Sequence, residues 1–219
     1  MHRIQFVCFV VITLMFFKLL KCSGNRHMQP FIVNGKYAKI EKFPHSVYLE
    51  MRCWRDYLGA ITWELSNCGS SILNQMILLT AAHCLDFCIE RGEIVAVAGH
   101  ENVNKATAIR RVKSILLHEN YSDMSFADDI ALVFLEESLP LGNTMKRVIL
   151  TKQNSVGLTA MIAGWGLIND DERREEKTYI LRSAPQIVRS NRDCFVPEWR
   201  MTGLLCAGST NINQPRATR

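Results

Sequence analysis

The pentapeptide Thr80-Ala81-Ala82-His83-Cys84 is the most informative stretch of this 219-residue sequence, because it places a histidine directly after an apolar run. A histidine beside a cysteine at the end of a strand can be a hydrogen-bonded core residue, so the pentapeptide alone leaves a structural and a catalytic interpretation open. Two further motifs follow in order, Asp128-Asp129-Ile130-Ala131-Leu132 and Gly164-Trp165-Gly166. The presence of all three motifs in this order favours the catalytic interpretation.

Short runs rich in valine, isoleucine and leucine surround these motifs, with turn-forming residues between them. Glu93–Gly99 and Arg110–His118 partly alternate apolar and polar residues, as strands with one buried face do. There is one modest helical candidate, Ser190–Cys194, so the pattern predicts an all-β barrel or sandwich. The predicted strands are Gln75–Thr80, Glu93–Gly99, Arg110–His118, Ile130–Leu135, Leu158–Gly164, Tyr179–Val188 and Leu204–Gly208.

The amino terminus has the pattern of a secretory signal peptide. A basic start at residues 2–3 precedes an apolar run at residues 6–17, and small residues follow at 23–24. An uncleaved membrane anchor is the alternative, but a dozen helical residues reach only about 18 Å, against roughly 30 Å of hydrocarbon core. We therefore expect residues 1–24 to be a signal peptide and the protein to be secreted to the extracellular space.

The composition is that of an ordinary globular protein, with 48% hydrophobic and 21% charged residues. The formal net charge is +5, but residues 1–24 contain three basic residues and no acidic one, which leaves 23 basic against 21 acidic residues. This excess is too small to favour nucleic acid or an anionic membrane as a partner. We expect neither kind of partner once the signal peptide is removed.

Six cysteines follow the signal peptide: Cys53, Cys68, Cys84, Cys88, Cys194 and Cys206. An even number in an exported chain predicts three disulfide bonds, and composition alone leaves their pairing open. No close pair of cysteines or histidines repeats at the spacing of zinc ligands, so we expect no metal and no other cofactor.

Taken together, the motifs resemble those of the chymotrypsin/trypsin family of serine endopeptidases. Ile32-Val33-Asn34-Gly35 looks like the mature amino terminus of that family. Phe43-Pro44-His45-Ser46-Val47 and Cys68-Gly69-Ser70-Ser71-Ile72-Leu73 look like its early strands, and Met201–Gly208 resembles the strand before its substrate pocket. The resemblance extends from Ile32 to about Gly208.

The resemblance implies a role for two residues. His83 matches the general base, which takes the proton of the serine hydroxyl and later gives it to the leaving amine. Asp129, directly before Ile130-Ala131-Leu132, matches the buried carboxylate that orients the imidazole. We expect the neighbouring Asp128 to be an exposed loop residue.

The resemblance also implies a fold of two antiparallel β-barrels. The peptidase domain is expected at residues 32–208, with a first barrel at about 32–137 and a partial second barrel at about 144–208. Because few strands are recognisable in the second part, we expect its barrel to be incomplete. Residues 25–31 are expected to form a short propeptide-like segment and residues 209–219 a disordered tail.

Within the family, Cys68 and Cys84 match the pair that clamps the loop of the catalytic histidine, and Cys194 and Cys206 match the pair around its intermediate helix. The resemblance leaves Cys53 and Cys88 to form the third disulfide. The single Asn-x-Ser/Thr acceptor, at Asn120, predicts N-glycosylation in a surface loop.

The chain departs from the family in two respects. The nucleophilic serine of the family sits in a Gly-Asp-Ser-Gly-Gly segment, and residues 1–219 contain no such segment. Phe31 stands where the family usually has arginine or lysine before the mature amino terminus. We therefore expect a serine-type endopeptidase homologue, acting on or binding protein substrates or inhibitors, that is inactive as written. The alternative is a non-catalytic homologue that acts as a secreted binding protein.

Overall fold

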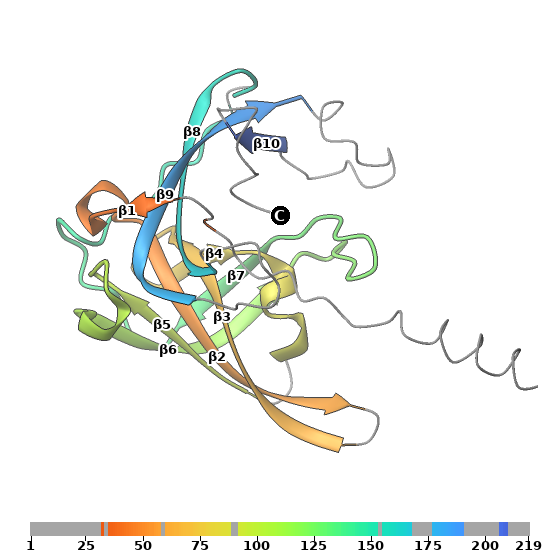
Figure 1. Ribbon diagram of the computed structural model, residues 1–219. Helices are drawn as coiled ribbons and strands as arrows, with labels where there is room; N and C mark the ends of the chain where they lie inside the picture. Colours follow the sequence, from red (N-terminus) through yellow and green to blue (C-terminus); the bar gives the residue numbers. More distant parts are fainter. Residues whose placement is uncertain are drawn as a thin grey trace, which may run out of the picture.

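A closed barrel and a second, four-stranded sheet form the architecture of the protein (Figure 1). The structure, a computed structural model, describes residues 32, 35–57, 60–88, 92–152, 155–167, 177–190 and 206–209. The barrel has the strand order β2-β3-β4-β7-β6-β5, and in the second sheet β9 pairs with β1, β8 and β10. The strands are β1 (Lys36–Tyr37), β2 (Ser46–Tyr57), β3 (Ala60–Ile72), β4 (Ile77–Thr80), β5 (Gly92–Ala98), β6 (Ala108–Leu117), β7 (Ala131–Leu135), β8 (Thr159–Leu167), β9 (Lys177–Arg189) and β10 (Cys206–Ser209).

Four short 3-10 helices connect the strands of the described segments: η1 (Ile40–Lys42), η2 (Ala82–Cys84), η3 (Asp86–Cys88) and η4 (Val103–Lys105). Every pair of neighbouring strands is antiparallel. No helix within these segments is long and apolar enough to cross a membrane.

Alternation of side chains builds the core of the barrel. In β7 the residues 131, 133 and 135 are buried while their neighbours are not, and β4 and β5 show the same two-residue period. Leu78, Ala96 and Val133 are completely buried in this way. The core cluster also contains both cysteine pairs of the barrel, so the disulfides lie inside it.

The hairpin of β2 and β3 is longer than the rest of the barrel. The two strands pair over their whole length, from Ser46 opposite Ser71 to Tyr57 opposite Ala60. β5 covers β2 only as far as Cys53, and β4 pairs with only the last two residues of β3. The outer end of the hairpin therefore projects beyond the barrel (Figure 1).

A small apolar cluster connects the second sheet to the barrel. Trp165 of β8 is 3% exposed and meets the ring of Tyr48 of β2 edge to face, with ring centroids 5.9 Å apart. Burial raises the pKa of Tyr48 to about 12. The indole N–H of Trp165 and the backbone N–H of Leu181 both donate to the carbonyl oxygen of Glu101, each over 2.8 Å.

The structure confirms the all-β fold, and the predicted strand runs fall on β4 to β10 within a few residues at their ends. β1 and most of the β2–β3 hairpin were not predicted, although Leu49, Met51 and Cys53 of β2 are buried and alternate with Glu50 and Arg52. The helical candidate Ser190–Cys194 lies outside the described residues from position 191 on. The signal peptide, the 25–31 segment and the tail predicted at 209–219 also lie outside them, apart from Ser209.

Candidate active site

His83 lies in η2, directly after the end of β4. Leu78 and Thr80 of β4 point into the barrel, and the chain then turns at Ala81 so that the histidine emerges at the rim. Its side chain is 20% exposed. The disulfide between Cys84 and Cys68 joins this turn to β3 and fixes the backbone next to the histidine.

Asp129 meets His83 because their strands are neighbours. β7 pairs with β4, and the register places Ala131 opposite Thr80, so the residues just outside both strands lie side by side. The Asp129 Oδ2 atom lies 2.6 Å from His83 Nδ1, and Oδ1 accepts a hydrogen bond of 2.8 Å from the backbone N–H of His83. Both carboxylate oxygens therefore hold the same histidine.

The contacts with His83 determine the charge of the Asp129 carboxyl group. Burial by itself would raise the pKa of the Asp129 carboxyl group, whose side chain is 15% exposed. The hydrogen bonds from the ring and the backbone of His83 outweigh the burial, so the pKa lies below its ordinary value. Asp129 is thus a carboxylate near neutral pH, and it accepts a proton-bearing Nδ1 of the imidazole.

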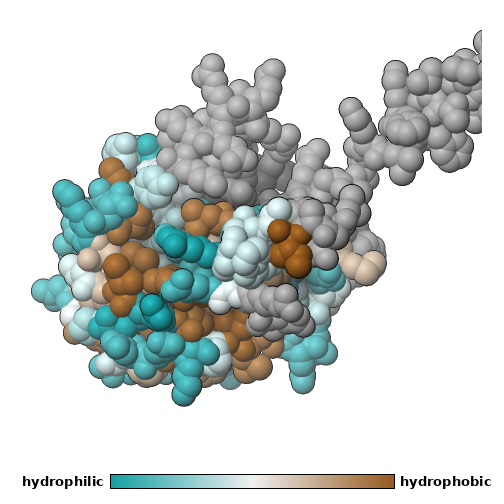
Figure 2. Space-filling view, turned by 90° about the horizontal axis from the view of Figure 1, so that it is seen from below, coloured by the Kyte–Doolittle hydropathy of each residue, from teal (hydrophilic) through white to brown (hydrophobic). Residues whose placement is uncertain are grey.

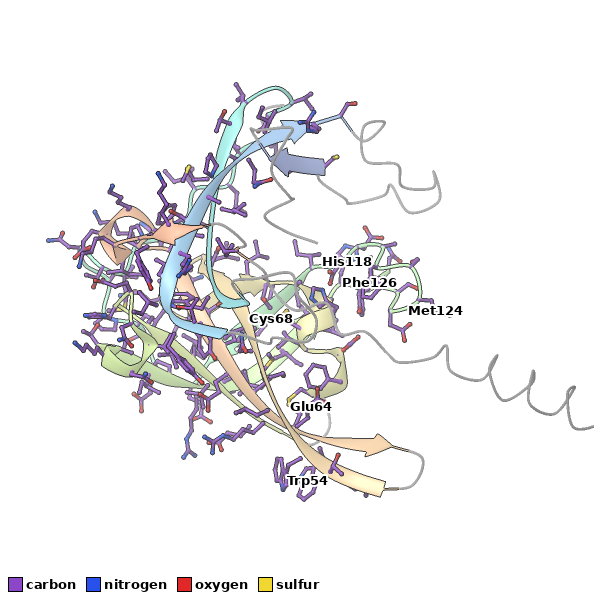
Figure 3. All side chains as sticks on the ribbon, viewed as in Figure 1. Trp54, Glu64, Cys68, His118, Met124 and Phe126 are labelled. Atoms are coloured by element: carbon purple, nitrogen blue, oxygen red, sulfur yellow. A yellow bond between two sulfur atoms is a disulfide. The ribbon has the colours of Figure 1, made fainter. Side chains whose placement is uncertain are left out.

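The loop that precedes Asp129 has a strained backbone. Phe126 and Asp128 are non-glycine residues with positive φ, of 55° and 52°. Aspartate tolerates this conformation, whereas a bulky aromatic residue rarely adopts it. The ring of Phe126 stands edge to face against the ring of His83, with centroids 6.0 Å apart. Figure 3 shows Phe126 in the loop that follows His118.

A hydrogen bond anchors the same loop to the barrel. The hydroxyl group of Tyr121 donates to the Asp86 carboxylate of η3 over 2.9 Å, and burial together with this bond raises the pKa of Tyr121. Sequence analysis missed both Tyr121 and Phe126, because single aromatic residues in a loop give no periodic signal. The positive φ values that bring Phe126 to the histidine are visible only in the fold.

A pocket of about 390 Å³ opens beside His83 between the barrel and the second sheet. Its lining includes His45, Cys68 and His83 from the barrel side and Trp165 from β8. Burial lowers the pKa of His45, which favours an uncharged imidazole at this end of the pocket. The histidine of the pair therefore borders a partly enclosed space instead of open solvent.

The disulfides predicted at Cys68–Cys84 and Cys53–Cys88 are confirmed. Cys206 is disulfide-bonded, but Cys194 lies outside the described residues, so the Cys194–Cys206 pairing remains a prediction.

Cys68, Cys84 and His83 form a group whose ligand atoms lie within 4.8 Å of one another. The two sulfur atoms are bonded to each other, and a disulfide offers no thiolate to a metal ion. The close approach of Cys84 Sγ to His83 Nε2, 3.7 Å, follows from their adjacent positions in η2. The cluster is thus accounted for by the disulfide.

Asn120 is exposed in the loop that follows β6, and its backbone N–H donates to His118 Nδ1 over 3.2 Å. Its glycosylation remains a prediction.

Comparison with family models gives a match to trypsin over residues 32–216, which is most of the chain. The chain belongs to the trypsin family. Curated relatives agree with this assignment. The chain is 31% identical to trypsin zeta of Drosophila melanogaster over 141 residues, which covers 62% of this chain and 48% of that protein. It is 29% identical to serine protease SP24D of Anopheles gambiae over 194 residues, covering 84% of this chain and 65% of that protein.

Solved structures support the same fold for this trypsin-family chain. It superposes on the scabies mite inactivated protease paralogue S-D1 with a TM-score of 0.67 at 22% identity, covering 81% of this chain and 75% of that one. It superposes on neuropsin from mouse brain with a TM-score of 0.65 at 24% identity, covering 82% and 76%. The chain spans between about half and two thirds of the length of the curated relatives it matches.

Proposed function

We propose that this protein is a secreted serine-type endopeptidase homologue in which His83 serves as general base and Asp129 orients it. The hydrogen bond of 2.6 Å between His83 Nδ1 and Asp129 Oδ2 carries this proposal. Protein or peptide substrates, or protease inhibitors, are the partners that such a site accepts.

The geometry assigns a separate task to each ring nitrogen. With Nδ1 donating its proton to Asp129, Nε2 of His83 is left as an acceptor. An Nε2 acceptor can take the proton of a hydroxyl nucleophile and return it to a leaving amine, while the carboxylate stabilises the imidazolium that forms in between. The second bond of Asp129, to the backbone N–H of His83, fixes the carboxylate and so the orientation of the ring.

Catalysis needs a nucleophile and oxyanion donors in addition to the base. In the family these come from a Gly-Asp-Ser-Gly-Gly segment, which the 219 residues do not contain. We therefore propose that a polypeptide of residues 1–219 alone does not hydrolyse peptides. A longer product of the same gene that contains the segment would use His83 and Asp129 as an active peptidase does.

Two preparations test this proposal. The 219-residue chain is assayed with a panel of peptide substrates, beside the His83→Ala variant and the His118→Ala variant, which alters an exposed histidine as a control. We expect no turnover that depends on His83. Hydrolysis that His83→Ala abolishes and His118→Ala leaves intact would show that a serine within these residues acts as nucleophile.

The second preparation is the product of the full-length transcript. If it contains the nucleophile segment, Asp129→Asn is expected to lower its kcat by about 10⁴-fold, because the amide holds the imidazole in the wrong tautomer. A small loss of activity would contradict the role of Asp129. A genuine stop codon after residue 219, with an inactive product, would favour the non-catalytic binding protein.

Export is part of the proposal. Amino-terminal sequencing of secreted material is expected to begin near Asn25, after the predicted signal peptide at residues 1–24. An intact Met1 in a membrane fraction would contradict it.

A further inference from the structure

β3 has a long edge without a strand beside it. Between Ala60 and Ser70 the strand pairs with β2 on one side, and β4 joins the other side only at Ser71 and Ile72. Among the described residues, no other strand or isolated bridge covers this edge.

The hydrogen-bonding pattern shows which backbone groups face the open edge. Ile72 donates its N–H to the His45 carbonyl across the hairpin, whereas the carbonyl of Gly69 accepts from the Thr80 hydroxyl on the opposite side. N–H and C=O groups of a strand point to alternate sides, and the β2–β3 register runs without a shift. The odd-numbered residues, Ile61, Trp63 and Leu65 among them, therefore present their backbone groups to the open edge.

The same three residues carry exposed apolar side chains. Ile61 is 56% exposed, Trp63 58% and Leu65 64%. Trp54 of β2 lies opposite Trp63, and the two rings are in contact, tilted by 34° with centroids 3.9 Å apart. Figure 3 shows Trp54 on the side of the hairpin that faces away from the barrel. On the face of the molecule seen in Figure 2, hydrophobic residues are exposed between hydrophilic ones.

This edge lacks the features that prevent strands from pairing. Ala60–Asn67 contains no lysine or proline, and its one charged residue is Glu64. The register of the strand is continuous, so no bulge turns the edge away. An exposed, regular, largely apolar edge of this kind is a template for a further strand.

We propose that a second copy of this chain pairs with the β3 edge, antiparallel, about a two-fold axis at Trp63. This register sets Trp63 opposite Trp63 of the second copy and Ile61 opposite Leu65, so the apolar stripe faces itself. About six backbone hydrogen bonds form between the edge-facing groups of residues 61, 63 and 65 on the two strands. Such self-complementarity is what a two-fold interface requires.

Apolar matching favours this register over the one with its axis at Glu64. An axis at Glu64 would also join edge-facing groups and pair Trp63 with Leu65, but it would set Ile61 opposite the polar Asn67. With the axis at Trp63, Glu64 lies opposite Thr62 of the second copy. The interface is small, so we expect reversible association with a Kd in the micromolar range.

Cysteine cross-linking tests the register. Directly opposed residues of an antiparallel pair have Cα atoms about 5.5 Å apart, within the range of a disulfide. Trp63→Cys is therefore expected to give a covalent dimer on non-reducing gels. Leu65→Cys alone is not, because its two copies lie about 13 Å apart along the strands. A mixture of Ile61→Cys and Leu65→Cys chains is expected to cross-link to each other.

Sedimentation measures the association without added cysteines. Trp63→Arg is expected to weaken dimerisation at least tenfold, whereas Tyr179→Arg, which changes a 54% exposed aromatic residue of β9, leaves it unchanged. A chain that stays monomeric at roughly 100 μM would overturn the proposal. A disulfide formed by Leu65→Cys but not by Trp63→Cys would also overturn it, because the register would then be different. A third contrary result would be a monomeric chain that binds phosphatidylcholine vesicles and loses this binding in Trp63→Arg, because the apolar edge would then contact lipid.

Discussion

The two barrel disulfides are nested, and this arrangement can be tested by removing each in turn. The Cys68–Cys84 loop, with a sequence separation of 16, lies wholly inside the Cys53–Cys88 loop, with a separation of 35. All four cysteines are at most 6% exposed, so changing either pair to alanine removes two buried sulfur atoms. The cavity cost is therefore similar for both pairs and largely cancels when they are compared.

Loop entropy gives the expected costs. With the inner bridge closed, the outer bridge constrains a loop of only about 20 residues, and its loss costs about 3.3 kcal/mol. Loss of the inner bridge, with the outer one intact, costs about 2.6 kcal/mol by the same relation. Loss of both costs about 6 kcal/mol, which is comparable with the whole stability of many domains.

The measurement is urea unfolding followed by tryptophan fluorescence. Free energies of unfolding extrapolated to water are compared, because loss of a cross-link changes the dependence of this free energy on urea concentration. The Cys53→Ala/Cys88→Ala variant is expected to be less stable than Cys68→Ala/Cys84→Ala by about 0.7 kcal/mol. The reverse order, or a cost under about 1 kcal/mol for either pair, would refute the loop-entropy reasoning.

Four further outcomes are expected. The pKa of Asp129 is lower in the folded state than in the unfolded state, so the carboxylate stabilises the fold fully above the unfolded pKa of about 4. This stabilisation is lost as the pH falls through the folded pKa. Between pH 6 and pH 3 the urea midpoint of Asp129→Asn is therefore expected to fall less than that of the unchanged protein. In His83→Ala the burial of Asp129 is opposed by fewer hydrogen bonds, so its carboxyl pKa, followed by ¹³C NMR, is expected to rise; an unchanged value would contradict the cause assigned to it. Gly92→Ala places a Cβ atom 2.5 Å from Cys88 Sγ and is expected to cost about 1–3 kcal/mol, whereas Gly69→Ala, with no atom within 4 Å, is expected to be near neutral in the same assay. Removal of N-linked sugars should lower the apparent mass of secreted protein and leave an Asn120→Gln variant unchanged.

Most of the barrel could be predicted because short runs rich in valine, isoleucine and leucine are separated by turn-forming residues. Ile130–Leu135 is a continuous apolar run and Glu93–Gly99 partly alternates, and the structure has strands at both places. Most of the β2–β3 hairpin was not predicted, although Leu49, Met51 and Cys53 of its inner half are buried at every second position; its outer half extends beyond the strand that covers β2.

The His83–Asp129 contact could be expected from the resemblance of the motifs, but not from spacing alone. Forty-six residues separate the two side chains, and only the pairing of β4 with β7 brings them together. Phe126 illustrates what remained out of reach. Its contact with His83 depends on a backbone conformation that local propensity disfavours, and the fold around it imposes that conformation.

The contact between the barrel and the second sheet depends on a main-chain group, the carbonyl oxygen of Glu101. Trp165 and Leu181 bind the main chain at this point, and every amino acid supplies the same carbonyl oxygen. The side chain of Glu101 forms a separate ion pair, 2.6 Å long, with the exposed Lys39. The identity of the residue at position 101 therefore carries little information about the main-chain contact that joins the two sheets.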